Sequence, residues 1–213
     1  MAGGAPLTYV LRGSTLFTFH FPTLHFPLDT LTAIHARRSV RPGEYADTPI
    51  DRTTLNELVS AANAAPSHRK TYPWRFVVFD TASAKTELGD YLAERQQAAA
   101  ERPIPAIKLK KTRQRPGLAA AAIAIVMNPD LEHLPEWEEV SATASAVQNL
   151  WLAATAKGLV GYWSSPGLIT SGADDFLGLA EGEKCLGIFY LGHPKETPAE
   201  IERPGVEGKV VYR

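Results

Sequence analysis

Three apolar segments of strand length constrain the fold of this chain more than any other feature. They are WRFVVF at residues 74–79, LAAAAIAIVMN at 118–128 and CLGIFYLG at 185–192. None shows the strict alternation of apolar and polar residues that is typical of a strand with one face in water. We therefore expect strands that are buried on both faces, in a sheet flanked by helices.

Helical patterns fill the intervals between these strands, and LVGYWSS at 159–165 is a fourth predicted strand. Asp29 is a candidate cap for the first helix and Asp51 for the second, which stops at Pro66. Further helices are predicted from Ser83 through Arg95, over 138–157 and over 174–179. The order indicates the α+β class: a central mixed, mostly antiparallel sheet of about four to five strands flanked by helices.

Composition narrows the class of protein. The chain has 213 residues, with 22 Lys and Arg against 23 Asp and Glu, and this balance gives no electrostatic argument for a nucleic-acid partner. A lone cysteine, Cys185, excludes an intramolecular disulfide framework and suits a reducing compartment, so we expect a cytoplasmic protein. The length fits one domain, placed at 30–213, with an appendage.

Residues 1–29 differ from the remainder of the chain, because they lack helical or strand periodicity. The apolar stretch is broken by Arg12, Thr18 and His20, and no cleavage-site pattern of small residues closes it, so a signal peptide is not predicted. No window is apolar for long enough to span a membrane. We expect an N-terminal extension that packs on the domain or on a partner subunit, or an upstream stretch included by the choice of start site.

The segment ERPIPAIKLKKTRQRPG at 101–117 is rich in proline and cations. Its simplest interpretation is a solvated mobile loop. The alternative is a lid over a pocket, because long loops inside compact domains are often functional.

The familiar motifs of nucleotide and hydrolase sites are absent from the sequence. There is no G-x-G-x-x-G after a strand, no P-loop and no G-x-S-x-G. No histidine stands in a metal-binding motif, so no metal site is predicted. What remains is a cluster of three arginines in RRSVR, the basic loop APSHRKTYPW and the turn GYWSSPG. Guanidinium groups suit a phosphate held by two hydrogen bonds, although arginines at a helix end also complement the helix dipole.

The order RRSVR, TLNELVSAANAAPS, PWRFVVF, VSATASAVQNLWLAATAKGLVGYW and YLGHP resembles the FMN-dependent nitroreductase family, especially its short single-domain members. The resemblance runs from about Leu31 to the C-terminus. It implies a nitroreductase-like fold, an FMN cofactor with NADH or NADPH as electron donor, and a homodimer with its cofactor sites at the subunit interface.

The resemblance also implies which residues contact the cofactor. The phosphate and ribityl chain would be held by the RRS-x-R element and by a tail arginine: Arg37, Arg38, Ser39, Arg41 and Arg203. A second group would approach the flavin of the other subunit: Pro66, Ser67 and His68. The stretch after the long helix would lie near the flavin ring: Trp163, Ser164 and Ser165. No dedicated catalytic acid or base is expected.

The implied activity is ping-pong reduction of nitroaromatics, quinones or similar small acceptors, with hydride passing through FMN. Two alternatives stay open. One is a dehydrogenase or oxidase for a specific metabolite on the same scaffold, and the other is a flavin-binding protein without turnover. The sequence does not name the physiological acceptor.

Overall fold

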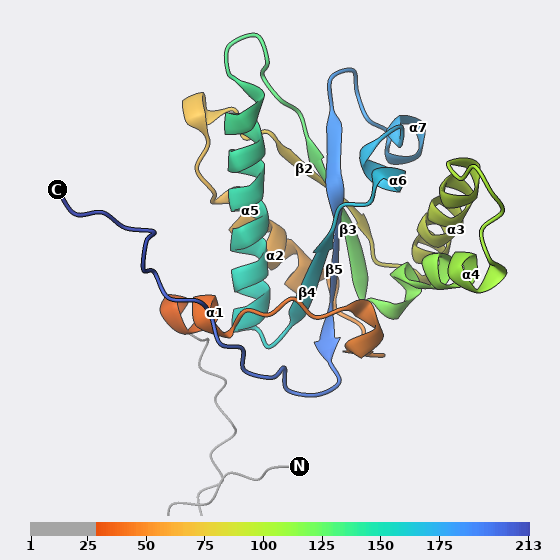
Figure 1. Cartoon of the computed structure of the whole chain (residues 1–213), viewed down its shortest axis with the longest axis horizontal. Helices are drawn as coiled ribbons and strands as arrows, with labels where there is room; N and C mark the ends of the chain where they lie inside the picture. Colours follow the sequence, from red (N-terminus) through yellow and green to blue (C-terminus); the bar gives the residue numbers. More distant parts are fainter. Residues whose placement is uncertain (1–28) are drawn as a thin grey trace, which may run out of the picture.

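The computed structural model describes residues 29–213. Its centre is a five-stranded sheet in the order β1-β5-β3-β2, with β4 also paired to β5 (Figure 1). The strands are β1 Tyr45–Ala46, β2 Trp74–Phe79, β3 Ala121–Met127, β4 Val160–Ser164 and β5 Lys184–Pro194. All four strand pairings are antiparallel, and one isolated parallel bridge joins Ser39 to Gly161. The predicted α+β class and mostly antiparallel sheet are confirmed.

Seven α-helices surround the sheet in the described part of the chain. They are α1 Thr30–Ala36, α2 Arg52–Asn63, α3 Ala82–Ala98, α4 Ala106–Gln114, α5 Glu136–Ala156, α6 Gly167–Thr170 and α7 Asp174–Leu177. Short 3₁₀ turns lie at Pro42–Glu44, His68–Lys70 and Pro116–Leu118. No helix among residues 29–213 is long and apolar enough to cross a membrane.

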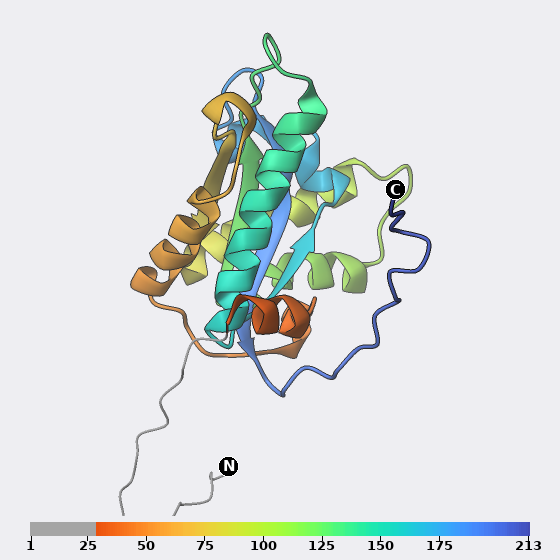
Figure 2. The same ribbon diagram turned by 90° about the vertical axis from the view of Figure 1, so that its left-hand side faces the viewer.

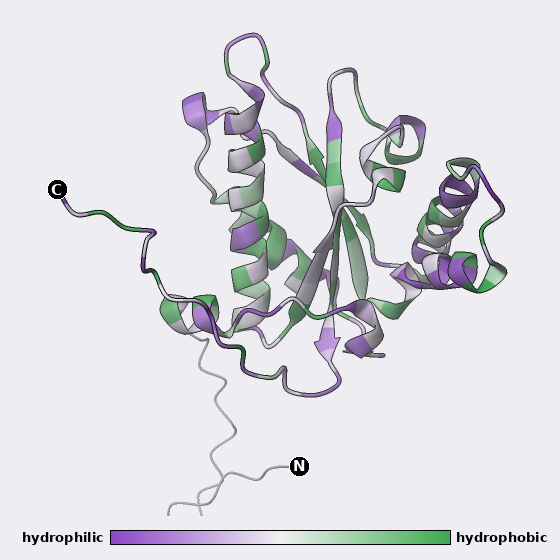
Figure 3. Ribbon diagram, viewed as in Figure 1, coloured by the Kyte–Doolittle hydropathy of each residue, from purple (hydrophilic) through white to green (hydrophobic). Residues whose placement is uncertain are grey.

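The helices form two layers, one on each face of the sheet (Figures 1 and 2). On one face, α2 and α5 bury Leu58 and Leu150 against Ile123 and Phe189. On the other face, the core contains Leu88 of α3 and Ile169 of α6. The strands between the layers carry apolar residues along their middle parts, whereas both ends of β5 are hydrophilic (Figure 3). β3 is buried along its whole length, as its sequence indicates, because it lies between β2 and β5.

Side-chain caps explain where three of the helices begin. Asp29 accepts hydrogen bonds from the backbone N–H groups of Leu31 and Thr32, at 3.0 and 3.1 Å. Asp51 accepts one from Thr54 N at 2.8 Å. Both caps agree with the sequence prediction, whereas α3 is capped by Thr81 and so begins one residue before Ser83.

The structure corrects three other expectations. β2 is not buried on both faces: of its six residues Trp74 and Phe79 alone are buried, and Val78 is 37% exposed. It is also an edge strand, paired with β3. Residues 106–114 form α4, which packs on α3, where a loop was expected. The fifth strand, β1, was not predicted, since two residues are too few to show a period. The proposed N-terminal extension lies outside the described residues, except for Asp29.

Gly161 permits a close approach between β4 and the core. An added Cβ at this position would lie 2.2 Å from Cζ of Phe189. Phe189 is 1% exposed and packs edge-to-face on Trp151, with ring centroids 5.1 Å apart. The ring therefore has little room to move away from a larger residue.

We expect Gly161→Ala to lower the free energy of unfolding by about 1–3 kcal/mol, the usual cost of overpacking a well-filled core. Urea denaturation would measure it. Gly117→Ala is the matched control, because an added Cβ at that position meets nothing within 4 Å. Equal stability of the two variants would show that Phe189 is not confined.

Candidate functional site

The RRSVR segment is attached to the free edge of β4. The backbone N–H of Val40 donates to the carbonyl oxygen of Gly161 at 3.0 Å, beside the Ser39–Gly161 bridge. Val40 is buried, whereas Ser39 and Arg41 on either side of it are exposed. This alternation is that of an extended segment, and it directs the polar side chains outward.

Tyr45 of β1 secures the same segment from inside. Its hydroxyl lies 2.7 Å from the carbonyl oxygen of Val40 and 3.2 Å from that of Tyr190. Burial raises the pKa of Tyr45, so its hydroxyl stays protonated and able to donate. Gly192 makes room for the ring, because an added Cβ there would lie 2.5 Å from Cδ2 of Tyr45.

Three of the predicted site arginines meet where α1 ends. Arg203 donates from Nη2 to the carbonyl oxygen of Arg37 at 3.0 Å, and Arg38 donates from Nε to that of Ala199 at 3.2 Å. These bonds join the C-terminal tail to the end of α1. The Arg37 guanidinium lies over Trp151 of α5, 4.5 Å from the ring centroid.

The arginine cluster lacks negative charge. No ion pair to Arg37, Arg38 or Arg203 occurs among the described residues. Burial, followed by the charges of Arg203 and Arg38, holds the pKa of Arg37 below its ordinary value. Like charges held close together and partly buried are unfavourable unless an anion balances them. The cluster is therefore suited to a multiply charged anion such as a phosphate.

A cavity of about 590 Å³ opens next to this cluster. Arg38 and Ser39 line one side, and the start of the tail, from Lys195 to Ala199, lines the other. Lys195 is fixed to the 3₁₀ turn by a bond from its Nζ to the carbonyl oxygen of Gly43 at 3.0 Å. The lining also includes Glu44 and Glu196, so the cavity is polar and of mixed charge, with Arg38 as the member of the arginine cluster that faces it.

Trp163, Ser164 and Ser165 lie near the same edge, a few residues along β4 from the Gly161 bridge. Trp163 is half-buried and donates from Nε1 to the carbonyl oxygen of Leu186 at 3.2 Å, while Ser165 is exposed. Gly187 permits this packing: its φ is +130°, and an added Cβ would lie 2.5 Å from the carbonyl oxygen of Ser164.

Pro66, Ser67 and His68 lie elsewhere in the chain. They line a cavity of about 440 Å³ with the first turns of α5, where His68 Nδ1 is 2.5 Å from Glu138 Oε2. The adjoining loop contains three non-glycine residues with positive φ, namely Arg69, Lys70 and Tyr72. Such conformations cost about 1–3 kcal/mol each and cluster at functional sites.

The long helix α5 separates the two groups (Figure 1). Glu138 near its start contacts His68, and Trp151 near its end contacts Arg37. Thirteen residues at 1.5 Å each place these contacts about 20 Å apart along the helix axis. Within one chain, the structure brings together Arg37, Arg38 and Arg203. It places residues 163–165 farther along the strand that pairs with residues 39–40, and it leaves residues 66–68 at the opposite end of α5.

Sequence reasoning missed Tyr45 and the tail from Lys195 to Ala199 as parts of this region. A two-residue strand has no detectable period, and the tail shows no regular pattern. The neighbouring Pro-Gly turn before Tyr45 is the one available signal. Among residues 29–213, no group of His, Cys, Asp or Glu side chains is suited to hold a metal ion.

Comparison with known proteins identifies the family of this chain. The profile of the "Nitroreductase family" matches residues 34–193, so this chain belongs to that family. Curated relatives include "Putative NAD(P)H nitroreductase YfhC" of Bacillus subtilis, 26% identical over 83% of this chain and 90% of the relative. Another is 5,6-dimethylbenzimidazole synthase of Rhodospirillum rubrum, 30% identical over 88% of this chain and 92% of the relative.

Solved structures agree on the fold. A nitroreductase-like family protein from Bacillus cereus superimposes with a TM-score of 0.73 and 25% identity, over 87% of this chain and 96% of that one. A Bacteroides fragilis nitroreductase with bound FMN gives a TM-score of 0.65 and 24% identity, over 87% and 99%. The expected nitroreductase-like fold is therefore confirmed.

The arginine cluster predicts stabilisation by phosphate. We expect saturating sodium phosphate to raise the thermal midpoint above that in sodium chloride of equal ionic strength, by roughly 2–4 °C for ~1 kcal/mol of binding. Arg37→Met should reduce the difference to the general stabilisation that phosphate gives as an excluded salt. Arg69→Met, at the opposite end of α5, should keep the full difference; equal responses of the two variants would exclude the cluster as the anion site.

Proposed function

We propose that this protein is an FMN-dependent NAD(P)H oxidoreductase that reduces nitroaromatics, quinones or similar small acceptors. The observation that carries the proposal is the arginine cluster, which has no acidic partner among the described residues and adjoins a cavity of about 590 Å³. Family membership supports it, as do the name of the Bacillus subtilis relative and the FMN bound in the Bacteroides fragilis structure.

The residues present fit FMN, because its phosphate monoester would supply the negative charge that the arginine cluster lacks. In this proposal, Arg37, Arg38 and Arg203 hold the phosphate, and Ser39 and Arg41 contact the rest of the cofactor. Trp163, Ser164 and Ser165 are assigned to the flavin ring. Proline has no N–H, so an amide contact to the ring comes from Ser164 or Ser165 rather than Pro166.

Bound FMN would accept hydride from a reduced nicotinamide and later pass two electrons to the acceptor. The chain's own contribution is binding and electrostatics. Guanidinium groups near the cofactor favour its more negative, reduced state and so raise its potential. β4 and β5 hold Trp163 and Ser164 in place on the rigid sheet, and no side chain is assigned as a proton donor.

We also propose a homodimer, because one chain separates the two halves of the predicted site by the length of α5. Pro66, Ser67 and His68 can meet the arginine cluster in a second copy that runs antiparallel to the first. The exposed tail supports this arrangement. It carries Ile201, Val206 and Val211 at 53%, 67% and 79% exposure and extends away from the sheet (Figure 1).

The proposed catalytic unit is a single domain, residues 30–213, preceded by the extension. We place it in the cytoplasm on the strength of its one cysteine, Cys185, which is buried and unpaired.

The absorption spectrum of the purified protein tests the cofactor and the donor. We expect oxidised-flavin bands that bleach anaerobically on addition of NADPH or NADH and return on addition of a nitroaromatic or quinone. Bands that persist with both donors would refute the reductase. A protein that stays colourless after FMN is added would refute the cofactor.

Shared sites predict complementation between two inactive variants. Arg37→Met removes a residue of the cluster, and His68→Ala removes one from the other half. If each site draws on both chains, random pairing after co-expression restores one intact site in the mixed dimer, roughly a quarter of wild-type activity. Separately expressed and unmixed variants are the control. No recovery in mixed dimers isolated with two affinity tags would show that both halves serve a site within one chain.

A second candidate is an enzyme for one specific metabolite, supported by the 30% identity to 5,6-dimethylbenzimidazole synthase. The same experiment separates the two, because such an enzyme would show flavin bands but poor turnover of general nitro compounds and quinones.

A further inference from the structure

A second cavity, of about 570 Å³, lies on the far side of the 3₁₀ turn Pro42–Glu44. It is lined by Arg41 from RRSVR, by Lys111 and Arg115 at the end of α4, and by Tyr162 and Leu118. Gly43 and Glu44 line both this cavity and the one beside Arg38 and Ser39. The two cavities are therefore neighbours that share one wall.

This cavity carries an excess of positive charge. Arg41, Lys111 and Arg115 have no ion-pair partner among the described residues, and Glu44 is the one acid in the lining. Arg113 of the same helix contrasts with them, because its Nε is paired with Asp90 Oδ1 at 2.6 Å and it does not line the cavity. Lys108 and Lys110 of α4 also have no ion-pair partner among the described residues, but they do not line the cavity. Its lining thus combines three unpaired cations with a single acid.

The cavity also offers apolar contact. Two of the residues that line it are apolar or aromatic: Tyr162 is half-buried, and Leu118 is 51% exposed. Tyr162 faces the side of the sheet opposite to Trp163, because consecutive strand residues alternate. Arg41, however, belongs to the proposed cofactor site and also lines this cavity. A ligand in this cavity therefore lies beside a residue assigned to the cofactor.

We propose that this cavity binds the anionic group of a reaction partner, with Lys111 and Arg115 recognising a carboxylate or phosphate and Tyr162 with Leu118 contacting its apolar part. The inference rests on the proposed function and names its substrate class: aromatic compounds that carry an acid group. Two reaction partners could supply the anionic group: the electron acceptor, through its acid group, and the nicotinamide donor, through its phosphates. α4, drawn as a strongly hydrophilic helix in Figure 3, is then a specificity element rather than a solvated loop.

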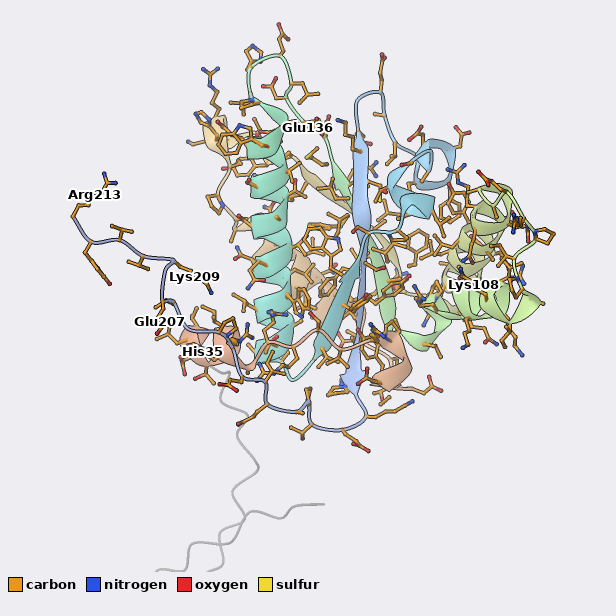
Figure 4. All side chains as sticks on the ribbon, in the orientation of Figure 1. His35, Lys108, Glu136, Glu207, Lys209 and Arg213 are labelled. Carbon is orange, nitrogen blue, oxygen red and sulfur yellow. The ribbon has the colours of Figure 1, made fainter. Side chains whose placement is uncertain are left out.

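Matched acceptors test the proposal. In wild type, kcat/KM for 4-nitrobenzoate should exceed that for the uncharged 4-nitrobenzamide, and the preference should shrink as salt is raised. The double variant Lys111→Met/Arg115→Met should lose about three- to tenfold of kcat/KM for the acid alone, the range for partly exposed charges. Lys108→Met is the control, since Lys108 is one turn away on α4 and does not line the cavity (Figure 4).

Measurements with different electron donors show which reaction partner supplies the anionic group. If the donor's phosphates occupy the cavity, the double variant raises KM for NADPH and NADH but not for 1-benzyl-1,4-dihydronicotinamide, and the acceptor preference stays unchanged. If the acceptor's acid group occupies the cavity, the double variant loses the preference for 4-nitrobenzoate, and its KM for NADPH and NADH stays unchanged. An unchanged KM for every partner overturns the inference.

Two binding measurements keep this test independent of turnover. Calorimetric titration with 4-aminobenzoate should show weaker binding in the double variant than in wild type or Lys108→Met, even if the protein reduces no acceptor at all. The affinity for FMN should be unchanged between wild type, the double variant and Lys108→Met, and so should the affinity for riboflavin. A selective loss of FMN affinity in the double variant would mean that these cations hold the cofactor phosphate, and it would overturn the inference.

Discussion

The central strand β5 is the constraint on which the rest of the structure depends. Its eleven residues pair with β3 along most of its length, with β4 from Ile188 to Gly192 and with β1 at His193 and Pro194. The RRSVR segment in turn hydrogen-bonds to β4, and Tyr45 of β1 reaches Val40 within that segment. The candidate site is therefore built on backbone pairing, which fixes its position more firmly than a surface loop could.

Charge is distributed unevenly over this framework. Although the chain is nearly neutral, cations without acidic partners among the described residues gather at two adjoining cavities, one beside Arg38 and the other beside Lys111. Holding like charges together is unfavourable; burial, and after it the charges of Arg203 and Arg38, hold the pKa of Arg37 below its ordinary value. Binding of anions at both cavities would offset the repulsion between these cations. The unpaired positive charge that destabilises the isolated chain would therefore strengthen the binding of anionic ligands.

The long helix α5 gives a geometric reason for the proposed dimer. It is straight in Figures 1 and 2, and it holds the His68 loop and the arginine cluster at opposite ends. A rigid helix of 21 residues cannot bring its own ends together. A two-fold related copy would place each end beside the opposite end of its partner and would complete two equivalent sites.

The sequence by itself determined the elements whose patterns are long or chemically explicit: the buried strand β3, the stripe of α5, and the caps at Asp29 and Asp51. It also indicated the arginines as a group. Tertiary structure decided what has no local period, namely the two-residue β1, the path of the tail and the packing of α4 on α3. It also decided that β2 is an edge strand and that Arg203 lies beside Arg37, 166 residues earlier, because only chain folding sets such distances.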